Sequence, residues 1–472
     1  MSLEADKPDA FSTFRDPSGI LTVSENSCLR FVRREYEQEA LDFLRSSLYS
    51  SWEKRGDVVA TEIRTGQPGP FSLCLEHPRI FFPSYPWEWS PAQWLAAAEL
   101  TLKLCDEAVT AGWILKDATP LNILFDGPRP VFVDLLSFAR RNPRSPIWMA
   151  QAQFVRTFLL PLVAHRWLGW PLASTLLRRD GNEPEDLYQS LAWIRRVHPR
   201  LLWPVTLPVW LSKGSTKSVA PNPATKKADA IEREPAVAGG VLHHTLATLR
   251  RQVRYAAPAL ADSRWSGYQD HLDHYSSRDS EGKYQFIANV LLQQKPRTVL
   301  DIGANTGTYS MLAARNGARV VALDSDVAAI ERLWRAAVTE HHNILPIVGN
   351  IARPTPSVGW ENAESLSLLD RAVGKFDMVF LLAVIHHILV SEQIPLSRIA
   401  SLCRRLTRCW LVVEWVPPTD PMFQQLMRGR DALYGSLQEQ DMFGAFNCHF
   451  EAVERHPLPN GRILFLFKRK ND

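Results

Sequence analysis

The chain has 472 residues, of which 46% are apolar and 22% charged, and its formal net charge is +4. This length exceeds that of one domain, so we expect two or three domains that each bury a core. The weak positive charge gives no strong sign of a nucleic-acid partner, and the six scattered cysteines favour reduced thiols over disulfides or a structural metal.

The N-terminal 14 residues are acidic and polar, without the order of charges and apolar residues that marks a signal peptide. The first elements that the pattern predicts are a strand hairpin, a helix and two further strands. They cover Gly19–Val23, Cys28–Val32, Glu35–Ser50, "VVATEI" (58–63) and "RIFFPSY" (79–85).

The segment 112–138 carries three polar residues at a distinctive spacing. Asp117 is followed five residues later by Asn122 and, after a turn, by Asp134 at the end of an apolar strand. This spacing resembles the catalytic and metal-binding loops of protein kinases and aminoglycoside-type phosphotransferases. In those families the first Asp orients the acceptor hydroxyl, while the Asn and the second Asp hold the magnesium of Mg-ATP. The resemblance implies an α+β kinase-like domain over residues 15–211.

Several departures from the kinase pattern favour a degenerate domain. No glycine-rich loop precedes the first helix, no V-A-I-K lysine is evident on the third strand, and Leu135 and Leu136 follow Asp134 in place of the D-F-G sequence. Phosphoryl transfer needs a loop that holds the phosphates as well as a metal site, and the sequence contains a recognisable pattern only for the metal site. The favoured interpretation is a domain that binds substrate, nucleotide or a partner. In the structural alternative, Asp117 and Asn122 only form hydrogen bonds that stabilise a turn.

The next apolar segment, Phe154–Trp170, contains Arg156, His165 and Arg166, so it predicts a buried helix and not a membrane span. Residues 212–240 are rich in Pro, Ala, Lys and Ser and nearly free of large apolar side chains, which predicts a linker. The linker separates the kinase-like domain from a C-terminal domain over 241–472. We expect a cytoplasmic protein, and the sequence gives no sign of its oligomeric state.

After the linker, strands and helices alternate. Short apolar runs such as "RTVLDI", "ARVVALD", "ILPIVGN", "FDMVFLL" and "CWLVVEWV" are separated by helical spacing, and the chain closes with a hairpin signal around Pro459-Asn460-Gly461. Strands that are apolar on both faces and alternate with helices predict a parallel sheet covered on both sides. The sequence therefore predicts an α/β domain whose parallel sheet ends in an antiparallel hairpin.

The loop after the first of these strands is the clearest ligand signal. Gly303, Asn305 and Gly307 give G-x-N-x-G, which lacks the third glycine that a dinucleotide pyrophosphate requires. Asp324 ends the next strand, where a carboxylate can accept both ribose hydroxyls of an adenosine. A tight turn without a ligand is the structural alternative, but the whole strand series agrees with an adenosine ligand that has no pyrophosphate.

From Trp265 to Arg469 these residues resemble the class I S-adenosylmethionine (SAM)-dependent methyltransferases, which implies a Rossmann-like seven-stranded sheet. The resemblance implies that Asp301, Gly303, Asn305 and Gly307 line the methionine moiety and that Asp324 holds the ribose. Asn350 and Ile351 would lie beside the adenine, although an aspartate is more usual at the position of Asn350. Together with the kinase-like front and "VEWVPPTDPM", the chain is similar to large bacterial methyltransferases of the host-range nodulation type.

Methyl transfer is an in-line displacement, so the protein must align the acceptor and remove its proton. "LLAVIHHIL" offers His387 and then His386 as general base, because imidazole titrates near neutral pH. A His pair that caps backbone in a turn is the structural alternative. Glu414 would orient substrate or cofactor. Tyr268, Tyr275, Lys283 and Tyr284 are candidates for a cover over the cofactor, or for packing residues.

The leading hypothesis is a two-domain SAM-dependent methyltransferase that acts on a hydroxyl or amine of a small molecule, saccharide or natural-product intermediate. An ATP-dependent phosphotransferase with an accessory C-terminal half is the competing enzyme. The non-enzymatic alternative is a pseudokinase scaffold coupled to a methyltransferase-like module. The sequence does not define the acceptor atom.

Overall fold

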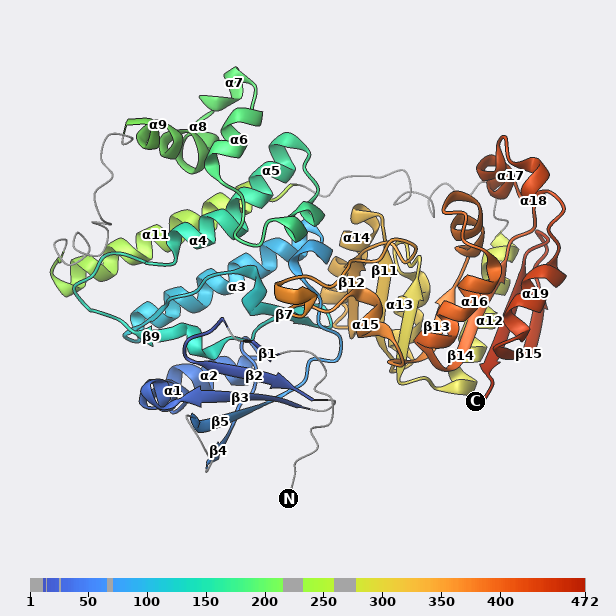
Figure 1. Ribbon diagram of the computed structural model, residues 1–472, viewed down its shortest axis with the longest axis horizontal. Helices are drawn as coiled ribbons and strands as arrows, with labels where there is room; N and C mark the ends of the chain where they lie inside the picture. The colour runs from blue at the N-terminus through green and yellow to red at the C-terminus, as the bar shows by residue number, and fades with distance from the viewer. Residues whose placement is uncertain are drawn as a thin grey trace. The chain divides into compact units, whose positions relative to one another are not determined.

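The computed structural model describes residues 12–13, 15–24, 27–65, 71–214, 232–258 and 277–471. The chain divides into two compact units (Figure 1). The N-terminal unit comprises Met1–Phe125, Pro130–Ala259 and Gly359–Glu364, and the C-terminal unit comprises Asp126–Arg129, Leu260–Val358 and Ser365–Asp472. Within the described ranges, no helix combines the length and the apolar character needed to cross a bilayer.

The N-terminal unit begins with an antiparallel sheet of order β1-β2-β3-β5-β4. The helices α1 (Glu37–Leu44) and α2 (Ser47–Arg55) connect β3 to β4. The strands are β1 (Ser12–Thr13), β2 (Gly19–Val23), β3 (Ser27–Arg33), β4 (Glu62–Thr65) and β5 (Phe71–Pro78). The prediction of a strand over residues 79–85 is wrong, and the strand β5 lies just before this stretch. Pro78 and Pro83 lack the N–H donors that a sheet needs, so the pairing does not continue through residues 79–85.

A long helix, α3 (Pro91–Thr110), forms the centre of this unit. The helix α11 (Pro235–Ala256) packs against α3 and against α5 (Leu160–Leu168). Its buried face is an apolar stripe at helical spacing, made of Ala238, Leu242, Leu246, Leu249 and Val253. The predicted domain boundary at residue 240 placed residues 241–256 in the C-terminal domain. In the structure these residues pack with the N-terminal unit, because their apolar stripe is buried there.

The C-terminal unit contains a seven-stranded sheet of order β12-β11-β10-β13-β14-β16-β15. The first five strands of this order are parallel, and β16 lies antiparallel between β14 and β15. The strands are β10 (Thr298–Ile302), β11 (Arg319–Asp324), β12 (Ile344–Val348), β13 (Phe376–Leu381), β14 (Thr407–Trp415), β15 (Phe450–Pro457) and β16 (Ile463–Arg469). The Rossmann-like sheet with a terminal antiparallel hairpin is confirmed.

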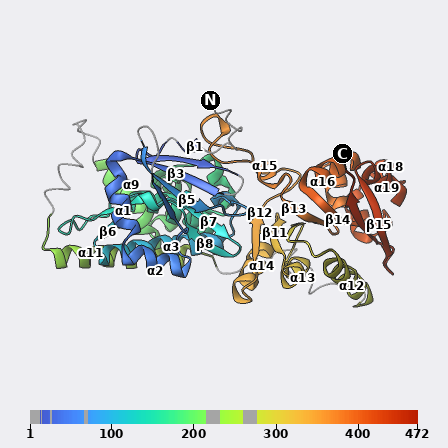
Figure 2. The same ribbon diagram turned by 90° about the horizontal axis from the view of Figure 1, so that it is seen from below.

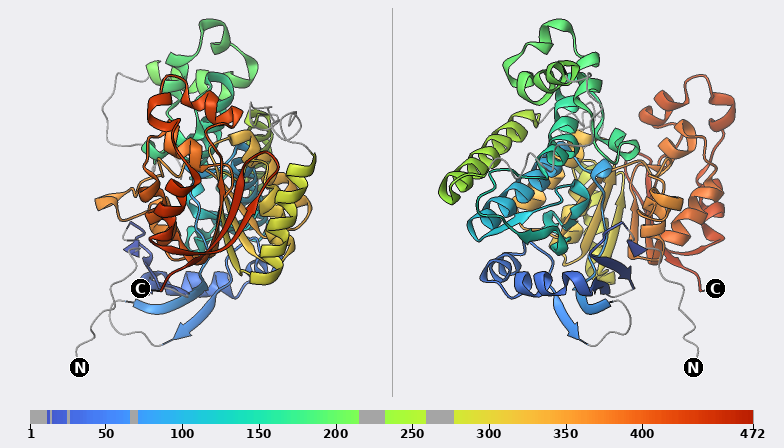
Figure 3. Two further views of the ribbon diagram at one scale, coloured as in Figure 1. Left: turned by 90° about the vertical axis from the view of Figure 1, so that its right-hand side faces the viewer. Right: turned by 60° about the vertical axis from the view of Figure 1, so that its left-hand side comes forward.

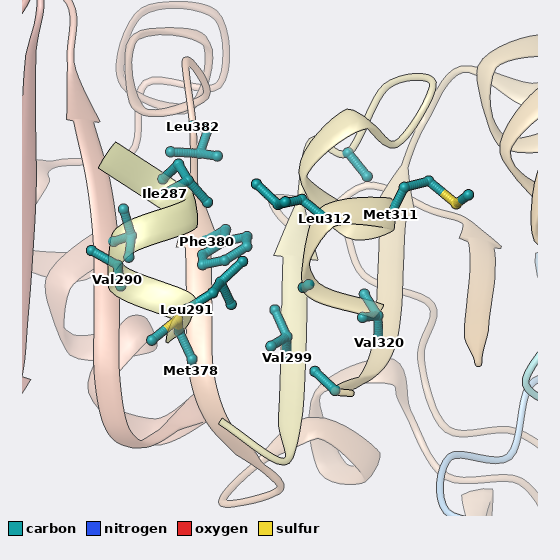
Figure 4. Packing of buried hydrophobic residues seen from close by; sticks show 14 of the residues in the cluster. Ile287, Val290, Leu291, Val299, Met311, Leu312, Val320, Met378, Phe380 and Leu382 are labelled. Atoms are coloured by element: carbon teal, nitrogen blue, oxygen red, sulfur yellow. The ribbon is translucent and has the colours of Figure 1, made fainter. Parts of the chain in front are cut away.

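Helices cover both faces of this sheet (Figures 2 and 3). One face carries α12 (Ser277–Gln294), α13 (Thr308–Arg315) and α14 (Val327–Thr339). The other carries α15 (Leu368–Ala372), α16 (Leu396–Leu406) and α19 (Glu439–Asn447). Ile287, Val290 and Leu291 of α12 pack into the core with Val299 and Phe380 of the central strands (Figure 4). This packing explains why the strands are apolar on both sides.

Candidate methyl-transfer site

The loop between β10 and α13 has the backbone of a ligand-binding turn. Gly303 and Gly307 have φ of 75° and 85°, in the left-handed region that favours glycine. A Cβ on Gly303 would lie 2.3 Å from Cγ2 of Val384, and one on Gly307 would lie 2.2 Å from Cδ1 of Leu333. Two independent reasons therefore require glycine at both positions: the backbone conformation, and the close packing of neighbouring elements against the loop.

Asp324, at the end of β11, fixes this loop. Its Oδ2 accepts a hydrogen bond from the backbone N–H of Asn305 at 2.8 Å, and its Oδ1 accepts one from Asp326 at 2.8 Å. Burial raises the pKa of the Asp324 carboxyl above its ordinary value. The side-chain Oδ1 of Asn305 is buried and has no hydrogen-bond partner among the described residues. Such an orphaned acceptor fits a ligand that brings its own donor, as the ammonium group of SAM does.

Asp301, at the end of β10, is 2% exposed. The hydroxyl of Ser310, in the first turns of α13, donates a hydrogen bond of 2.6 Å to Oδ2 of Asp301. Burial raises the pKa of Asp301 to about 6. Burial of this carboxyl costs free energy, and the hydrogen bond from Ser310 offsets part of that cost.

Asn350 and Ile351 follow β12. Oδ1 of Asn350 accepts a hydrogen bond from the N–H of Ala352 at 2.8 Å, and its amide group donates to Glu392 at 3.4 Å. Ile351 is buried. The carbonyl oxygen of Asn350 keeps one lone pair, so an adenine amino group can still donate to it. Glu392 is a polar neighbour of this position that the sequence pattern did not indicate.

His386 and His387 stand at the start of the π-helical turn His387–Ser391, after the loop that follows β13. Their rings are 4.3 Å apart, and the His386 ring stacks on Phe423. Val384, which contacts Gly303, lies two residues before His386, so the pair is next to the cofactor loop. His386 is buried and its Nδ1 has no partner among the described residues, whereas His387 is half-buried.

Burial disfavours the charged form of both imidazoles. Burial lowers the pKa of His386 well below the ordinary histidine value, and the charges of His387, Arg462 and Lys283 lower it further. Burial and Arg462 also lower the pKa of His387. Both rings therefore keep a basic lone pair at neutral pH, which a general base needs.

Glu414 is fully buried near the end of β14, between two cations. Lys283 of α12 lies 2.5 Å from its Oε2, and Nη1 of Arg462 lies 3.1 Å from its Oε1. Burial by itself would raise the pKa of Glu414, but Lys283 and Arg462 outweigh it and the pKa is lowered. A carboxylate bound on both oxygens is an anchor for these two cations and not a proton acceptor.

Two further groups complete the polar floor of the site. Nε of Arg462 lies 2.9 Å from Oδ2 of Asp420, whose other oxygen caps α17 (Pro421–Met427). Nζ of Lys283 lies 4.9 Å from the ring centroid of Tyr309, a cation–π arrangement. Burial raises the pKa of the Tyr309 hydroxyl, and Glu414 and Asp301 add to this effect. The four charges of Lys283, Arg462, Glu414 and Asp420 sum to zero.

Sequence reasoning missed the role of Arg462 and assigned Lys283 only to a cover. Arg462 follows a predicted turn, and no spacing rule connects it with Glu414, 48 residues earlier. Tyr284 packs partly buried against the core. Tyr268 and Tyr275 lie outside the described residues.

The three residues of the kinase-like motif lie in one cluster of the N-terminal unit. Gln153 donates to Oδ1 of Asp117 at 2.5 Å, and the Asn122 amide donates to Oδ2 at 3.3 Å. Burial raises the pKa of Asp117, and the charge of Asp134 acts in the same direction. On Asp134, Nη1 of Arg30 lies 2.6 Å from Oδ1.

Arg30 belongs to β3 and is 7% exposed, so a cation from this strand does reach Asp134, although the expected V-A-I-K lysine is absent. Ser137 donates to the other carboxylate oxygen of Asp134. Across the described ranges, no group of three or more His, Cys, Asp or Glu side chains is arranged to hold a metal ion.

Comparisons with known proteins agree with the C-terminal architecture. Residues 300–409 match the family model of a methyltransferase domain. The chain is 27% identical to the nodulation protein NoeA of Rhizobium meliloti (strain 1021), over 97% of this chain and 95% of that protein.

Two solved structures are also similar. One is the N-methyltransferase NodS from Bradyrhizobium japonicum WM9 in complex with S-adenosyl-l-homocysteine, 13% identical with a TM-score of 0.34 over 44% of this chain and 96% of NodS. The other is the bifunctional kinase-methyltransferase WbdD, 19% identical with a TM-score of 0.30 over 44% of each chain.

The matched domain spans the cofactor loop, Asp324 and the His pair, and the sheet order carries the antiparallel strand at the expected place. The chain contains a class I SAM-dependent methyltransferase domain, and it is a SAM-dependent methyltransferase.

Proposed function

We propose that this methyltransferase acts on a hydroxyl or amine of a small molecule, saccharide or natural-product intermediate. The observation that carries the proposal is the pair of neutral, buried or half-buried imidazoles beside the cofactor loop. An acceptor that carries a proton on oxygen or nitrogen needs such a base, whereas a thiolate or a thioether acceptor does not.

The bound cofactor would supply an electrophilic methyl group on a sulfonium. Asp324 would accept the ribose hydroxyls, while Gly303, Asn305, Gly307 and Asp301 would hold the methionine part. Asn350 and Ile351 would border the adenine. The orphaned Oδ1 of Asn305 supports this assignment, because it offers an acceptor in a loop whose backbone is otherwise satisfied by Asp324.

The half-buried His387 would receive the proton of the acceptor, and the buried His386 would orient His387 from the side opposite the solvent. Arg462 disfavours the imidazolium that would form on His387, and Glu414 and Asp420, which pair with Lys283 and Arg462, offset part of this repulsion. Glu414 acts in this scheme by positioning the two cations and α17 around the acceptor.

Calorimetric titration tests the cofactor assignment. We expect the wild-type chain to bind SAM, and Asp324→Ala to lose this binding by at least a factor of 100 because its carboxylate takes two ribose hydroxyls and also orders the loop. Asp326→Asn is the matched control, since it retains the helix cap beside Asp324 and removes only a charge. SAM binding that is equal in Asp324→Ala and wild type would contradict the assignment.

The acceptor class is tested by transfer of a labelled methyl group from SAM. Oligosaccharides with free amines are compared with their N-acetylated counterparts, which keep their hydroxyl groups but have no basic amine. His387→Asn should lower kcat by a factor of 100 to 10,000, the usual contribution of a general base, without weakening SAM binding. Wild-type kcat should stay level between pH 7 and 9 and decline only below the ordinary histidine pKa, because the pKa of His387 is lowered.

For the N-terminal unit we propose a degenerate kinase-like domain. The sheet order β1-β2-β3-β5-β4 with helices between β3 and β4, followed by the cluster of Asp117, Asn122 and Asp134, supports this assignment. The Arg30–Asp134 ion pair supports a domain without phosphoryl transfer, because the Asp that would hold magnesium already binds a guanidinium. We expect no magnesium-dependent ATP hydrolysis, and hydrolysis that is lost in Asp134→Ala would overturn this proposal.

A further inference from the structure

A small helical group at one end of the N-terminal unit exposes an unusual amount of apolar surface. The group consists of α6 (Pro184–Ser190), α7 (Trp193–Arg196) and a helical run formed by α8 (Pro199–Leu201), η7 (Leu202–Thr206) and α9 (Leu207–Gly214). It projects from the rest of this unit in two views (Figures 1 and 3). Its large exposed apolar residues are Trp193, Ile194, Val197, Trp203, Trp210 and Leu211. Single exposed apolar residues need no explanation, but a cluster of this kind marks an interaction surface.

The helical run from 199 to 214 is apolar on two faces. Leu201, Val205 and Val209 are buried and hold the run against its own unit. Trp203 and Trp210, seven residues apart, are exposed, so they lie on one outer face and Leu211 extends that face. A helix that only packs on its own domain needs the first face and not the second.

In the helical group, the cations Arg195, Arg196 and Arg200 outnumber the acids Glu185 and Asp186. From Leu191 to Gly214 the sequence contains no Asp or Glu, whereas it contains Arg195, Arg196, Arg200 and Lys213. Of the two acids of α6, Asp186 pairs with Arg178 at 2.5 Å, and Glu185 accepts a hydrogen bond of 3.3 Å from the hydroxyl of Ser212. The complement of this surface is therefore both apolar and negatively charged.

A groove of about 320 Å³ continues this surface inward. Trp203 belongs to both, and the other residues that line the groove include Leu159, Val163, Tyr255, Arg251 and Gln252. The Oε1 atom of Gln252 is buried without a hydrogen-bond partner among the described residues. A groove lined by apolar side chains together with a guanidinium and an amide matches an acyl chain under an anionic headgroup.

We propose that this helical group docks the protein on an anionic lipid bilayer. Tryptophan prefers the interface between headgroups and acyl chains, where its ring is apolar and its N–H is wet, and arginines on the same element attract anionic lipids. The group lies on the surface without spanning the bilayer. A protein partner with an acidic, apolar socket is the competing occupant, and so is a second copy of this chain.

The test is co-sedimentation of the full chain with vesicles. We expect binding to equimolar phosphatidylcholine and phosphatidylglycerol, at least tenfold weaker binding to phosphatidylcholine alone, and weakening as salt rises. Trp193→Ser/Leu211→Ser should reduce binding at least tenfold, and because the two side chains are 78% and 73% exposed the thermal unfolding of the variant should match wild type.

Trp360→Ser/Leu433→Ser is the matched control, since these side chains are 62% and 67% exposed outside the helical group. This control should bind vesicles like wild type. The proposal is overturned if the wild-type chain ignores anionic vesicles, or if the control loses binding equally. It is also overturned if sedimentation velocity shows a dimer that Trp193→Ser/Leu211→Ser dissociates while vesicles bind neither protein.

Discussion

At the scale of single residues, the methyl-transfer site is built on buried charge. Glu414 would be unstable in the core without Lys283 and Arg462, and these cations would be unstable without Glu414 and Asp420. The neutral imidazoles lie within the field of this balanced cluster. The site therefore depends on the completeness of the cluster and not on any one ion pair.

Removal of Arg462 tests that dependence. Arg462→Met leaves Glu414 buried with one partner and Asp420 with none of its guanidinium contacts, so the free energy of unfolding should fall by roughly 3 kcal/mol or more in urea titrations. The pKa of Glu414 should rise, because one of the two cations that lower it is gone. Arg455→Met is the control, since its pair with Glu439 is exposed and should contribute less than about 1 kcal/mol. Equal losses in both variants would contradict the role given to the cluster.

Asp301 provides a second test, based on pH. Its pKa rises from 3.8 in the unfolded chain to about 6 in the fold, so the folded state holds the proton more tightly and wild-type stability falls as pH rises through this window. The free energy of unfolding of Asp301→Asn should not fall in this pH range, because asparagine does not titrate. Above pH 6 this variant should be more stable than wild type by about 3 kcal/mol, at roughly 1.4 kcal/mol per pKa unit, and near pH 4 the two should be similar.

The same variant should bind SAM poorly, because Asp301 is proposed to help hold the methionine part of the cofactor. Urea titrations from pH 4 to 8, together with calorimetry, measure both effects. A stability difference that does not change with pH would show that Asp301 is not the titrating group.

At the scale of elements, the sequence predicted what depends on local pattern. The five parallel strands, the terminal hairpin and the glycine loop follow from apolar runs, turn residues and spacing, and the structure contains them. The strand at Phe71–Pro78 was missed because its apolar residues are interrupted by Ser72, Cys74 and Glu76, while the more apolar run after it contains proline. Arg462 was missed because it lies in the turn before β16 while its partner Glu414 lies on β14, and the packing of α11 was missed because its burial depends on α3.

At the start of α13, the energetic cost of crowded packing can be separated from the cost of a strained backbone. Gly307→Ala suffers both a positive φ and a 2.2 Å approach to Leu333, whereas Gly317→Ala has a similar φ of 88° and open space. Both variants should lose about 1 kcal/mol from the backbone, and Gly307→Ala should lose a further 1–3 kcal/mol and most SAM binding. Chemical denaturation compares them directly. Equal losses would mean that Leu333 moves aside without cost.

At the scale of the whole molecule, two cores are joined in one chain, and only one of them carries the cofactor loop. Scanning calorimetry should therefore show two unfolding transitions. SAM at 100 times its Kd should stabilise the C-terminal transition by about 2.7 kcal/mol and leave the other at its original temperature. Asp324→Ala should abolish the shift. One transition that moves as a whole would show that the two cores unfold together.

The antiparallel strand β16 has a consequence for synthesis on the ribosome. It pairs with both β14 and β15, which precede it in the chain, and Arg462 stands immediately before it. While β16 is still inside the exit tunnel, β14 has an open edge that can pair with other chains, and Glu414 lacks one of its two cations. In a nascent chain this sheet therefore stays incomplete and open to chaperones until β16 itself has emerged.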